Sequence, residues 1–238
     1  MRSAKQKQQI NESEASGFGF DLLADSYDNW YASRRGAMYD RLEKELIVNF
    51  LPAEAEGKKL LEVGCGTGHW SKFFSARGFE VIGIDISERM IKIAKNKNIA
   101  HSSFHVADGH STPFADSTFD IAAAITTLEF AADSEAMIAE MVRCVRKPGG
   151  KLLLGVLNAL CDHNQERRNR PGSPYASAKL FSPERLSELL KPLGPVQMMI
   201  AGFVPRHRWL LVLAPIFEFV GRLASSQHGA FIAAEVRL

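Results

Sequence analysis

The sequence predicts a doubly wound α/β fold, and three observations support that prediction. Short apolar runs typical of buried strands alternate along the chain with segments of helical periodicity. The first strand and helix of the alternation are joined by a glycine-rich turn, as in open α/β sheets that bind ligands. The chain has 238 residues, 46% of them hydrophobic, which is enough for one sizeable core. We therefore expect a mostly parallel sheet with helices on both faces.

The N-terminal part of the chain is predicted to be helical. Apolar residues recur at helical spacing from Asp21 to Phe50, which predicts two amphipathic helices ahead of Pro52. Residues 1–17 are charged and lack the apolar stretch of a secretory signal, so we expect a disordered lead-in there. A single domain is expected over residues 18–238, with the two helices forming an N-terminal cap.

Seven apolar runs predict the strands of the sheet. They lie at residues 58–63, 79–84, 104–107, 119–125, 151–157, 196–203 and 229–236. Helices are predicted at residues 69–77, 134–145 and 183–191, and another is expected to begin after Ser87 as its N-cap.

Two segments interrupt the alternation of strands and helices. The first, at about residues 158–180, is polar and too long for an ordinary connection. The second, at about residues 205–224, is apolar but too short to cross a bilayer, and Pro215 and Glu218 interrupt it. Because both segments follow late strands, we expect them at the carboxyl edge of the sheet, where such folds bind ligands.

Charge and cysteine content exclude several classes of function. The chain has 29 lysine and arginine residues against 27 acidic residues, and a net charge of +2 disfavours a polynucleotide partner. Its three cysteines, Cys65, Cys144 and Cys161, have neither the number nor the spacing of a disulfide framework or a zinc site. We therefore expect a cytoplasmic protein.

The stretch L-L-E-V-G-C-G-T-G-H-W at residues 60–70 is the most informative motif. Its glycine spacing differs from the G-x-G-x-x-G fingerprint of dinucleotide-binding folds, and no Gly-Lys-Ser/Thr follows as in a P-loop. Glu62 would repel a phosphate close to the loop. The loop is therefore expected to bind a ligand with little phosphate charge, and a positive charge would suit it.

Acidic residues mark the ends of the first three predicted strands. Glu62 lies in the first strand, Asp85 ends the second and Asp108 follows the third. Asp85 is placed to accept both hydroxyls of a ribose, and Asp108 to accept an adenine amino group. This row of acids suits S-adenosylmethionine, which has a ribose, an adenine, an ammonium group and a sulfonium but no phosphate.

Several ordered stretches resemble one known family. They are F-D-L-L-A-D-S-Y-D-N-W-Y, L-L-E-V-G-C-G-T-G, V-I-G-I-D-I-S-E-R-M, V-A-D-G-H-S-T-P-F-A-D-S-T-F-D and V-R-K-P-G-G, which together span about Phe20 to Gly150. The sequence resembles the class I S-adenosylmethionine-dependent methyltransferases, in the branch of the ubiquinone and menaquinone biosynthesis enzymes. The resemblance implies a Rossmann-like, seven-stranded sheet with an antiparallel last strand.

The resemblance also implies which residues contact the cofactor. The glycine loop would hold the methionine part, Asp85 the ribose and Asp108 the adenine, while N-terminal tyrosines close the site. The implied set is Tyr27, Tyr31, Glu62, Gly64, Cys65, Gly66, Gly68, Asp85, Ile86, Met90, Asp108, Gly109, Thr127 and Leu128. The sequence departs from many relatives at His110, which follows the acid-glycine pair.

The expected reaction needs no metal and no universal catalytic residue, because the sulfonium supplies the reactivity. His101, His105 and His110 straddle one strand and are not expected to converge on a metal. His110 and His163 are candidates for a general base.

The acceptor is expected to be a small molecule, apolar or aromatic, because the apolar segment at residues 205–224 has surplus apolar surface to line its pocket. That surplus could instead form a homodimer contact or a membrane-surface contact. Arg167, Arg168 and Arg170 are either solvated or hold an anionic substrate. A non-catalytic S-adenosylmethionine-binding module, an RNA or protein methyltransferase and a nicotinamide dehydrogenase remain alternatives.

Overall fold

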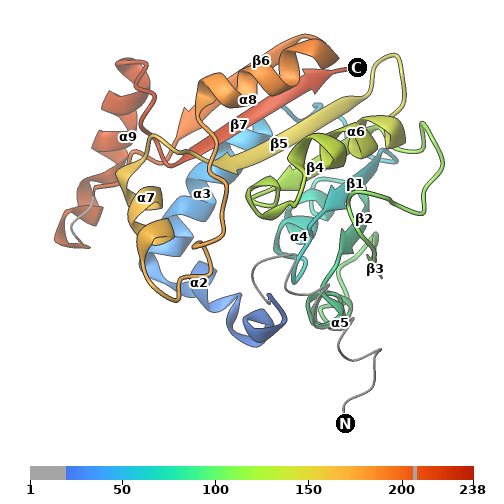
Figure 1. Cartoon of the computed structure of the whole chain (residues 1–238), viewed down its shortest axis with the longest axis horizontal. Coiled ribbons are helices and arrows are strands. Elements are labelled where there is room, and N and C mark those ends of the chain that lie inside the picture. The colour runs from blue at the N-terminus through green and yellow to red at the C-terminus, as the bar shows by residue number, and fades with distance from the viewer. Residues whose placement is uncertain (1–19, 206–207) are drawn as a thin grey trace.

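The computed structural model describes residues 20–205 and 208–238, and the predicted lead-in at residues 1–17 lies outside them. The described chain forms one seven-stranded sheet in the order β3-β2-β1-β4-β5-β7-β6, with helices against both faces (Figure 1). β7 pairs antiparallel with β5 and β6, whereas the pairs among β1 to β5 are parallel. The doubly wound fold with an antiparallel last strand is therefore confirmed.

The strands lie close to their predicted positions. They are β1 (Lys59–Val63), β2 (Glu80–Asp85), β3 (Ser102–Val106), β4 (Ile121–Ile125), β5 (Lys151–Leu157), β6 (Val196–Ala201) and β7 (Phe231–Arg237). β4, with the sequence I-A-A-A-I, is buried at every position. Its alternate residues join two different core clusters, because successive side chains of a strand point to opposite faces. The core is thus divided by the sheet into two layers.

The helices cover the two faces of the sheet. They are α2 (Asn29–Ala32), α3 (Arg34–Val48), α4 (His69–Ser75), α5 (Glu88–Asn96), α6 (Ser134–Cys144), α7 (Asp162–Asn169), α8 (Pro183–Leu190) and α9 (Ala214–Leu223). Short 3-10 turns occur at η1 (Phe20–Leu22), η2 (Ala24–Ser26), η3 (Leu128–Phe130), η4 (Lys191–Leu193) and η5 (Arg208–Leu213). Ser87 caps α5 as predicted, because its hydroxyl accepts a hydrogen bond from the Met90 amide at 3.0 Å.

The polar segment after β5 contains a helix, α7, which the sequence did not predict. Its residues D-H-N-Q-E-R-R-N have no apolar stripe, so the usual signal of an amphipathic helix is absent. Tertiary contacts hold the helix instead. The buried Asn164 amide donates to the carbonyl oxygens of Asn158 at 3.0 Å and Ala230 at 2.7 Å.

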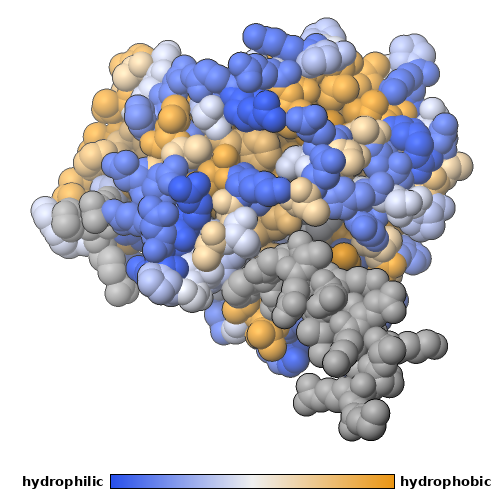
Figure 2. Space-filling model, viewed as in Figure 1, coloured by the Kyte–Doolittle hydropathy of each residue, from blue (hydrophilic) through white to orange (hydrophobic). Residues whose placement is uncertain are grey.

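The apolar segment before β7 folds into η5 and α9, and α9 lies at the end of the edge strand β6 (Figure 1). The Glu218 carboxylate fastens α9 to the end of β6 by accepting hydrogen bonds from the Gly202 and Phe203 amides at 3.0 and 2.9 Å. Many apolar side chains of η5 and α9 remain exposed, and an apolar surface covers this region in Figure 2. Among the described residues, no helix has the length and apolar character needed to cross a bilayer.

Candidate active site

The glycine loop connects β1 to α4 through three residues in the left-handed region. Gly64, Gly66 and Gly68 have φ angles of 71°, 52° and 80°. The Gly64 and Cys65 amides donate to the Ile84 carbonyl at 2.8 and 2.9 Å, which fastens the loop to the end of β2. A Cβ atom at Gly64 would lie 2.2 Å from the nearest atom of the Thr127 side chain. Glycine is therefore required at this position both for backbone conformation and for space.

Replacing Gly64 with alanine is expected to destabilise the fold by about 2–5 kcal/mol, because left-handed backbone strain and overlap with Thr127 add together. Gly57 offers a matched control: its φ is 73°, but a Cβ atom there would meet nothing within 4 Å. Gly57→Ala should cost only the backbone term, about 1–2 kcal/mol. Urea denaturation of both variants measures the difference. Equal losses of stability would contradict the close packing of Gly64 on Thr127.

Two carboxyl groups lie beneath and beside this loop. Glu62 is 2% exposed and accepts a hydrogen bond from the Ser71 hydroxyl at 2.5 Å, and burial raises its pKa to about 8. Asp85 accepts hydrogen bonds from the Gly66 amide at 2.8 Å and the Ser87 amide at 2.9 Å, and burial raises its pKa as well. Neither group forms an ion pair with a described residue. The site therefore favours a ligand that brings hydroxyl groups or a positive charge.

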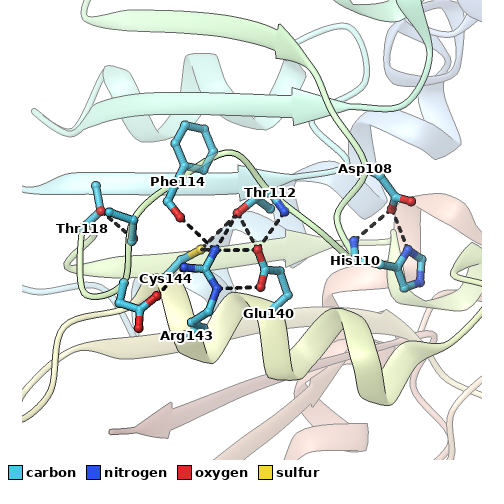
Figure 3. A network of polar contacts seen from close by, with 10 residues as sticks. Asp108, His110, Thr112, Phe114, Thr118, Glu140, Arg143 and Cys144 are labelled. Atoms are coloured by element: carbon cyan, nitrogen blue, oxygen red, sulfur yellow. Dashed lines mark hydrogen bonds and ion pairs between the residues drawn. The ribbon is translucent and has the colours of Figure 1, made fainter.

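The third predicted acid, Asp108, already has a partner. Its Oδ1 accepts hydrogen bonds from the His110 amide at 2.9 Å and lies 2.6 Å from His110 Nδ1 (Figure 3). Partial burial raises the pKa of Asp108, but these hydrogen bonds outweigh it and hold the pKa below its usual value. His110 thus occupies an oxygen of the Asp108 carboxylate that was predicted to accept a hydrogen bond from the adenine.

A polar network anchors the loop that carries Asp108 and His110. Glu140 Oε1 on α6 accepts hydrogen bonds from the amide and the hydroxyl of Thr112, each at 2.7 Å (Figure 3). Arg143, one turn later, binds both oxygens of Glu140 at 2.8 and 2.7 Å and the Phe114 carbonyl at 2.8 Å. Hydrogen bonds from Arg143, aided by those from Thr112, lower the pKa of Glu140 to about 2. The network holds residues 112–114 against α6.

The predicted N-terminal tyrosines lie over the glycine loop. Tyr31 stacks on His69, the residue after the loop, with ring centroids 3.5 Å apart and an interplanar angle of 7°. The Tyr27 ring is the side chain nearest to this face of Gly66, since a Cβ atom there would lie 3.8 Å from it. Burial raises the pKa of both phenols, which keeps them neutral.

The other predicted site residues differ in their exposure. Cys65, Met90 and Leu128 are buried, at 5%, 2% and 0% exposure, while Ile86 is 66% exposed. Gly109 is packed so closely that a Cβ atom there would lie 2.6 Å from a methyl carbon of Val63. Leu128 belongs to the main core cluster.

A cavity of about 450 Å³ opens beside the tyrosines. All four tyrosines of the chain line it, although they are spread from residue 27 to residue 175. Its aromatic lining consists of Phe20, Tyr27, Trp30, Tyr31, Tyr39, Phe130 and Tyr175. Its lining also includes one acidic residue, Glu43, and two basic residues, Arg167 and Arg170. This volume falls within the range of small-molecule sites.

The lining of this cavity differs in part from what the sequence predicts for the acceptor pocket. None of the described residues of the segment 208–223 lines this cavity, so its role in an acceptor pocket stays a prediction. It lies outside because α9 packs on β6, at the far edge of the sheet. The two candidate bases, His110 and His163, do not line this cavity either. The polar segment supplies Arg167, Arg170 and Tyr175 instead.

Glu43 was missed by the sequence-based predictions. It lies on α3 four residues after the buried Tyr39 and directly after the buried Leu42, so the spacing places an acid at the margin of the apolar face. An acidic residue at the margin of a buried helix face is the sequence feature that could have identified Glu43 as a site residue. Burial raises the pKa of Glu43 to about 7, aided by the nearby Asp40 and opposed by Arg167 and Lys44.

The arrangement of the chain also occurs in solved structures. An S-adenosylmethionine-dependent methyltransferase of Thermotoga maritima has a TM-score of 0.72 and 23% sequence identity, and the match covers 92% of this chain and 97% of that one. At this level of identity the likeness concerns the fold alone.

Sequence comparisons identify the family. Residues 61–154 match the family described as "Methyltransferase domain", and an uncharacterized protein of Methanocaldococcus jannaschii is 33% identical over 177 residues, 74% of this chain and 80% of that protein. The chain belongs to the class I S-adenosylmethionine-dependent methyltransferases. A malonyl-[acyl-carrier protein] O-methyltransferase of Serratia marcescens is 33% identical to this methyltransferase over 146 residues, 61% of this chain and 54% of that enzyme. The chain thus spans about half of that relative.

Membership in the family makes the protein an S-adenosylmethionine-dependent enzyme, as the motifs implied. The residues around the glycine loop fit this cofactor, because the hydrogen-bonded carboxyl groups of Glu62 and Asp85 lie next to the loop and have no ion-pair partner among the described residues. No group of three or more histidine, cysteine or acidic residues that could hold a metal ion occurs in residues 20–205 and 208–238.

Proposed function

We propose that this methyltransferase transfers the methyl group of S-adenosylmethionine to a small aromatic acceptor bound in the tyrosine-lined cavity. The observation that carries the proposal is the convergence of all four tyrosines on one cavity beside the glycine loop. Tyrosine, tryptophan and phenylalanine rings offer large flat surfaces on which an aromatic compound packs by offset or edge-to-face stacking. The acceptor therefore enters between the N-terminal helices and the segment 164–175.

Asp85 would hold the ribose hydroxyls, and the backbone of Gly64, Gly66 and Gly68 would accommodate the methionine part. Glu62 would favour its ammonium group, either directly or by shaping the loop. When bound, S-adenosylmethionine supplies an electrophilic methyl group on a sulfonium. The chain itself then has to align the acceptor with that methyl group and exclude water.

Tyr27 and Tyr31 are suited to connect the glycine loop, where the cofactor would bind, with the cavity, where the acceptor would bind. Both rings line the cavity and lie at the glycine loop, because Tyr27 is beside Gly66 and Tyr31 stacks on His69. Their edge-to-face contact, with centroids 5.9 Å apart, makes a continuous aromatic wall between the two. An acceptor resting on this wall would lie next to the cofactor's methyl group.

The proposal is tested by two measurements. Calorimetry should show binding of S-adenosylmethionine and S-adenosylhomocysteine but not of NAD. Transfer of labelled methyl from S-adenosylmethionine to a panel of phenols, catechols and quinols should then identify acceptors. Tyr175→Ala is expected to raise the KM for such an acceptor about tenfold, by removing one aromatic wall, without changing cofactor affinity.

Leu22→Ala is the control for Tyr175→Ala, because Leu22 is 85% exposed and lies outside the cavity lining. It should leave both constants unchanged. If Tyr175→Ala transfers methyl groups to every aromatic acceptor with the KM of the unaltered enzyme, the cavity is not the acceptor site.

A further inference from the structure

Two groups of opposite charge face the acceptor cavity without neutralising each other. Glu43 on α3 and Arg167 on α7 both line it. They are close enough for the guanidinium to lower the pKa of the carboxyl, yet they form no ion pair within 4 Å. Charged groups in a partly desolvated wall normally pair, because each unpaired charge is costly. Their separation points to a ligand that carries a partner for each.

Arg167 is held in place by stacking. Its guanidinium carbon lies 3.7 Å from the ring centroid of Tyr175 and 5.1 Å from that of Trp30. Stacking on an aromatic face leaves the in-plane N–H groups of a guanidinium free, and their fork matches the two oxygens of a carboxylate. No ion pair to a described residue occupies this fork. Arg167 also forms a side-chain hydrogen bond with Tyr175, and its remaining N–H groups are available to an anionic group in the cavity.

Glu43 lies close to the tyrosines of the cavity, Tyr175 among them. It interacts electrostatically with Tyr27 and Tyr31, the two tyrosines that lie over the glycine loop. Glu43 has no hydrogen-bond or ion-pair partner among the described residues, although Asp40 and Lys44 on the same helix pair with each other at 2.7 Å. A carboxylate in this position is available to accept a hydrogen bond from an acceptor's hydroxyl group.

We infer that the acceptor is a hydroxylated aromatic acid, whose carboxylate pairs with Arg167 and whose hydroxyl donates its proton to Glu43. The inference rests on the proposed function and narrows its substrate class. In the reaction, the hydroxyl oxygen forms a bond to the methyl carbon, and the carbon–sulfur bond breaks with its electron pair passing to sulfur. The hydroxyl proton passes to the Glu43 carboxylate. The products are the methyl ether, S-adenosylhomocysteine and protonated Glu43.

The arginine end is tested by binding alone, without cofactor. The three hydroxybenzoate isomers and their neutral methyl esters are titrated against the full chain by calorimetry. At least one acid should bind, and Arg167→Met should weaken it about tenfold or more while leaving the matching ester unaffected. Arg168→Met is the control, because Arg168 lies next in the chain but outside the cavity lining. It should change neither affinity.

The glutamate end is tested with the hydroxybenzoate that binds best. Glu43→Gln should lower kcat for methyl transfer about 10²–10⁴-fold while its calorimetric affinity changes little. Glu45→Gln is the control, since Glu45 is exposed on the same helix and pairs with Arg41. The rate of the unaltered enzyme should rise with pH through about 7, because Glu43 must be ionised to accept a proton, and this rise should disappear in Glu43→Gln.

The groups that face Glu43 also bear on this pH profile. They are Asp40 and Lys44 on α3, Arg167 on α7, Glu129 after β4, and Tyr27, Tyr31 and Tyr175. Glu129, whose pKa burial raises to about 7, is the competing titrating group. Glu129→Gln should therefore retain the rise in rate near pH 7, and loss of the rise in this variant would overturn the role of Glu43.

The outcomes separate this inference from the proposed function. If phenols or quinols are methylated but no hydroxybenzoate binds, the proposed function stands and the aromatic-acid assignment is overturned. Equal weakening of the acid and the ester in Arg167→Met would reduce Arg167 to a packing role and also overturn it. If no aromatic compound of either panel binds or is methylated, the proposed function itself fails.

Discussion

Replacing Asp85 with alanine is expected to weaken S-adenosylmethionine binding by about 1.5–3 kcal/mol, or roughly 10–150-fold. The carboxylate ends β2 and would accept both ribose hydroxyls, a charge-assisted contact that alanine cannot replace. It also accepts hydrogen bonds from the Gly66 and Ser87 amides. Removing it therefore releases the glycine loop as well as the ligand contact. Calorimetric titration of the variant with S-adenosylmethionine measures the loss.

Asp85→Asn separates these two contributions. The amide keeps one acceptor oxygen, and with it one of the two backbone hydrogen bonds, but it has no charge. Its affinity should lie between those of the native protein and Asp85→Ala. Melting temperatures of both variants show whether the loop or the whole fold is affected. If Asp85→Ala is folded and binds S-adenosylmethionine with native affinity, Asp85 does not bind the ribose.

The stability of the native protein is expected to fall as the pH rises from 5 to 8, and Glu62→Gln should remove much of that fall. Burial raises the pKa of Glu62 from 4.5 to about 8 in the folded state. Below the unfolded pKa both states are protonated, so the stabilisation by the neutral carboxyl is fully present. As the pH rises toward 8 the unfolded state ionises first, and the stabilisation is lost. The expected loss is on the order of 3 kcal/mol between pH 5 and 8.

Urea denaturation at pH 5 and pH 8 measures this effect without ligand. Glu62→Gln keeps the acceptor for the Ser71 hydroxyl but does not titrate, so its stability should vary less with pH. Glu43 and Glu129, whose pKa values burial raises to about 7, should leave a residual slope of the same sign. Glu80→Gln is the control, since Glu80 is exposed at the start of β2. A Glu62→Gln slope equal to the native one would mean that Glu62 is ionised in the folded protein.

Local sequence patterns were sufficient for the sheet and for the loop at its carboxyl edge. β4 could be located because five consecutive buried residues, I-A-A-A-I, leave no polar face, and α5 because Ser87 precedes a stripe of Met90, Ile91 and Ala94. The glycine loop was predictable because left-handed backbone at three alternate positions excludes almost every other residue. Local residue patterns and backbone sterics encode these features.

The pKa values of the predicted acids could not be predicted from local sequence patterns. Glu62, Asp85 and Asp108 have the same acidic character in the sequence, but burial raises the pKa of the first two while His110 hydrogen bonds lower that of the third. Burial and hydrogen bonding are set by neighbours from other elements, such as Ser71 for Glu62. The sequence therefore located the three acids but did not reveal their pKa values.

The sequence by itself determined the order of the strands along the chain, the glycine loop and the acids beside it, because short-range periodicity and backbone sterics encode them. Only the tertiary structure decided which residues surround the tyrosine-lined cavity. Tyr27 and Tyr175 are 148 positions apart in the chain yet line the same cavity. The apolar segment 208–223, which has the stronger hydrophobic signal, lies at the far edge, whereas the polar α7 brings Arg167 inside. Hydropathy predicts that a segment is buried or binds something, but the packing of distant elements determines what it faces.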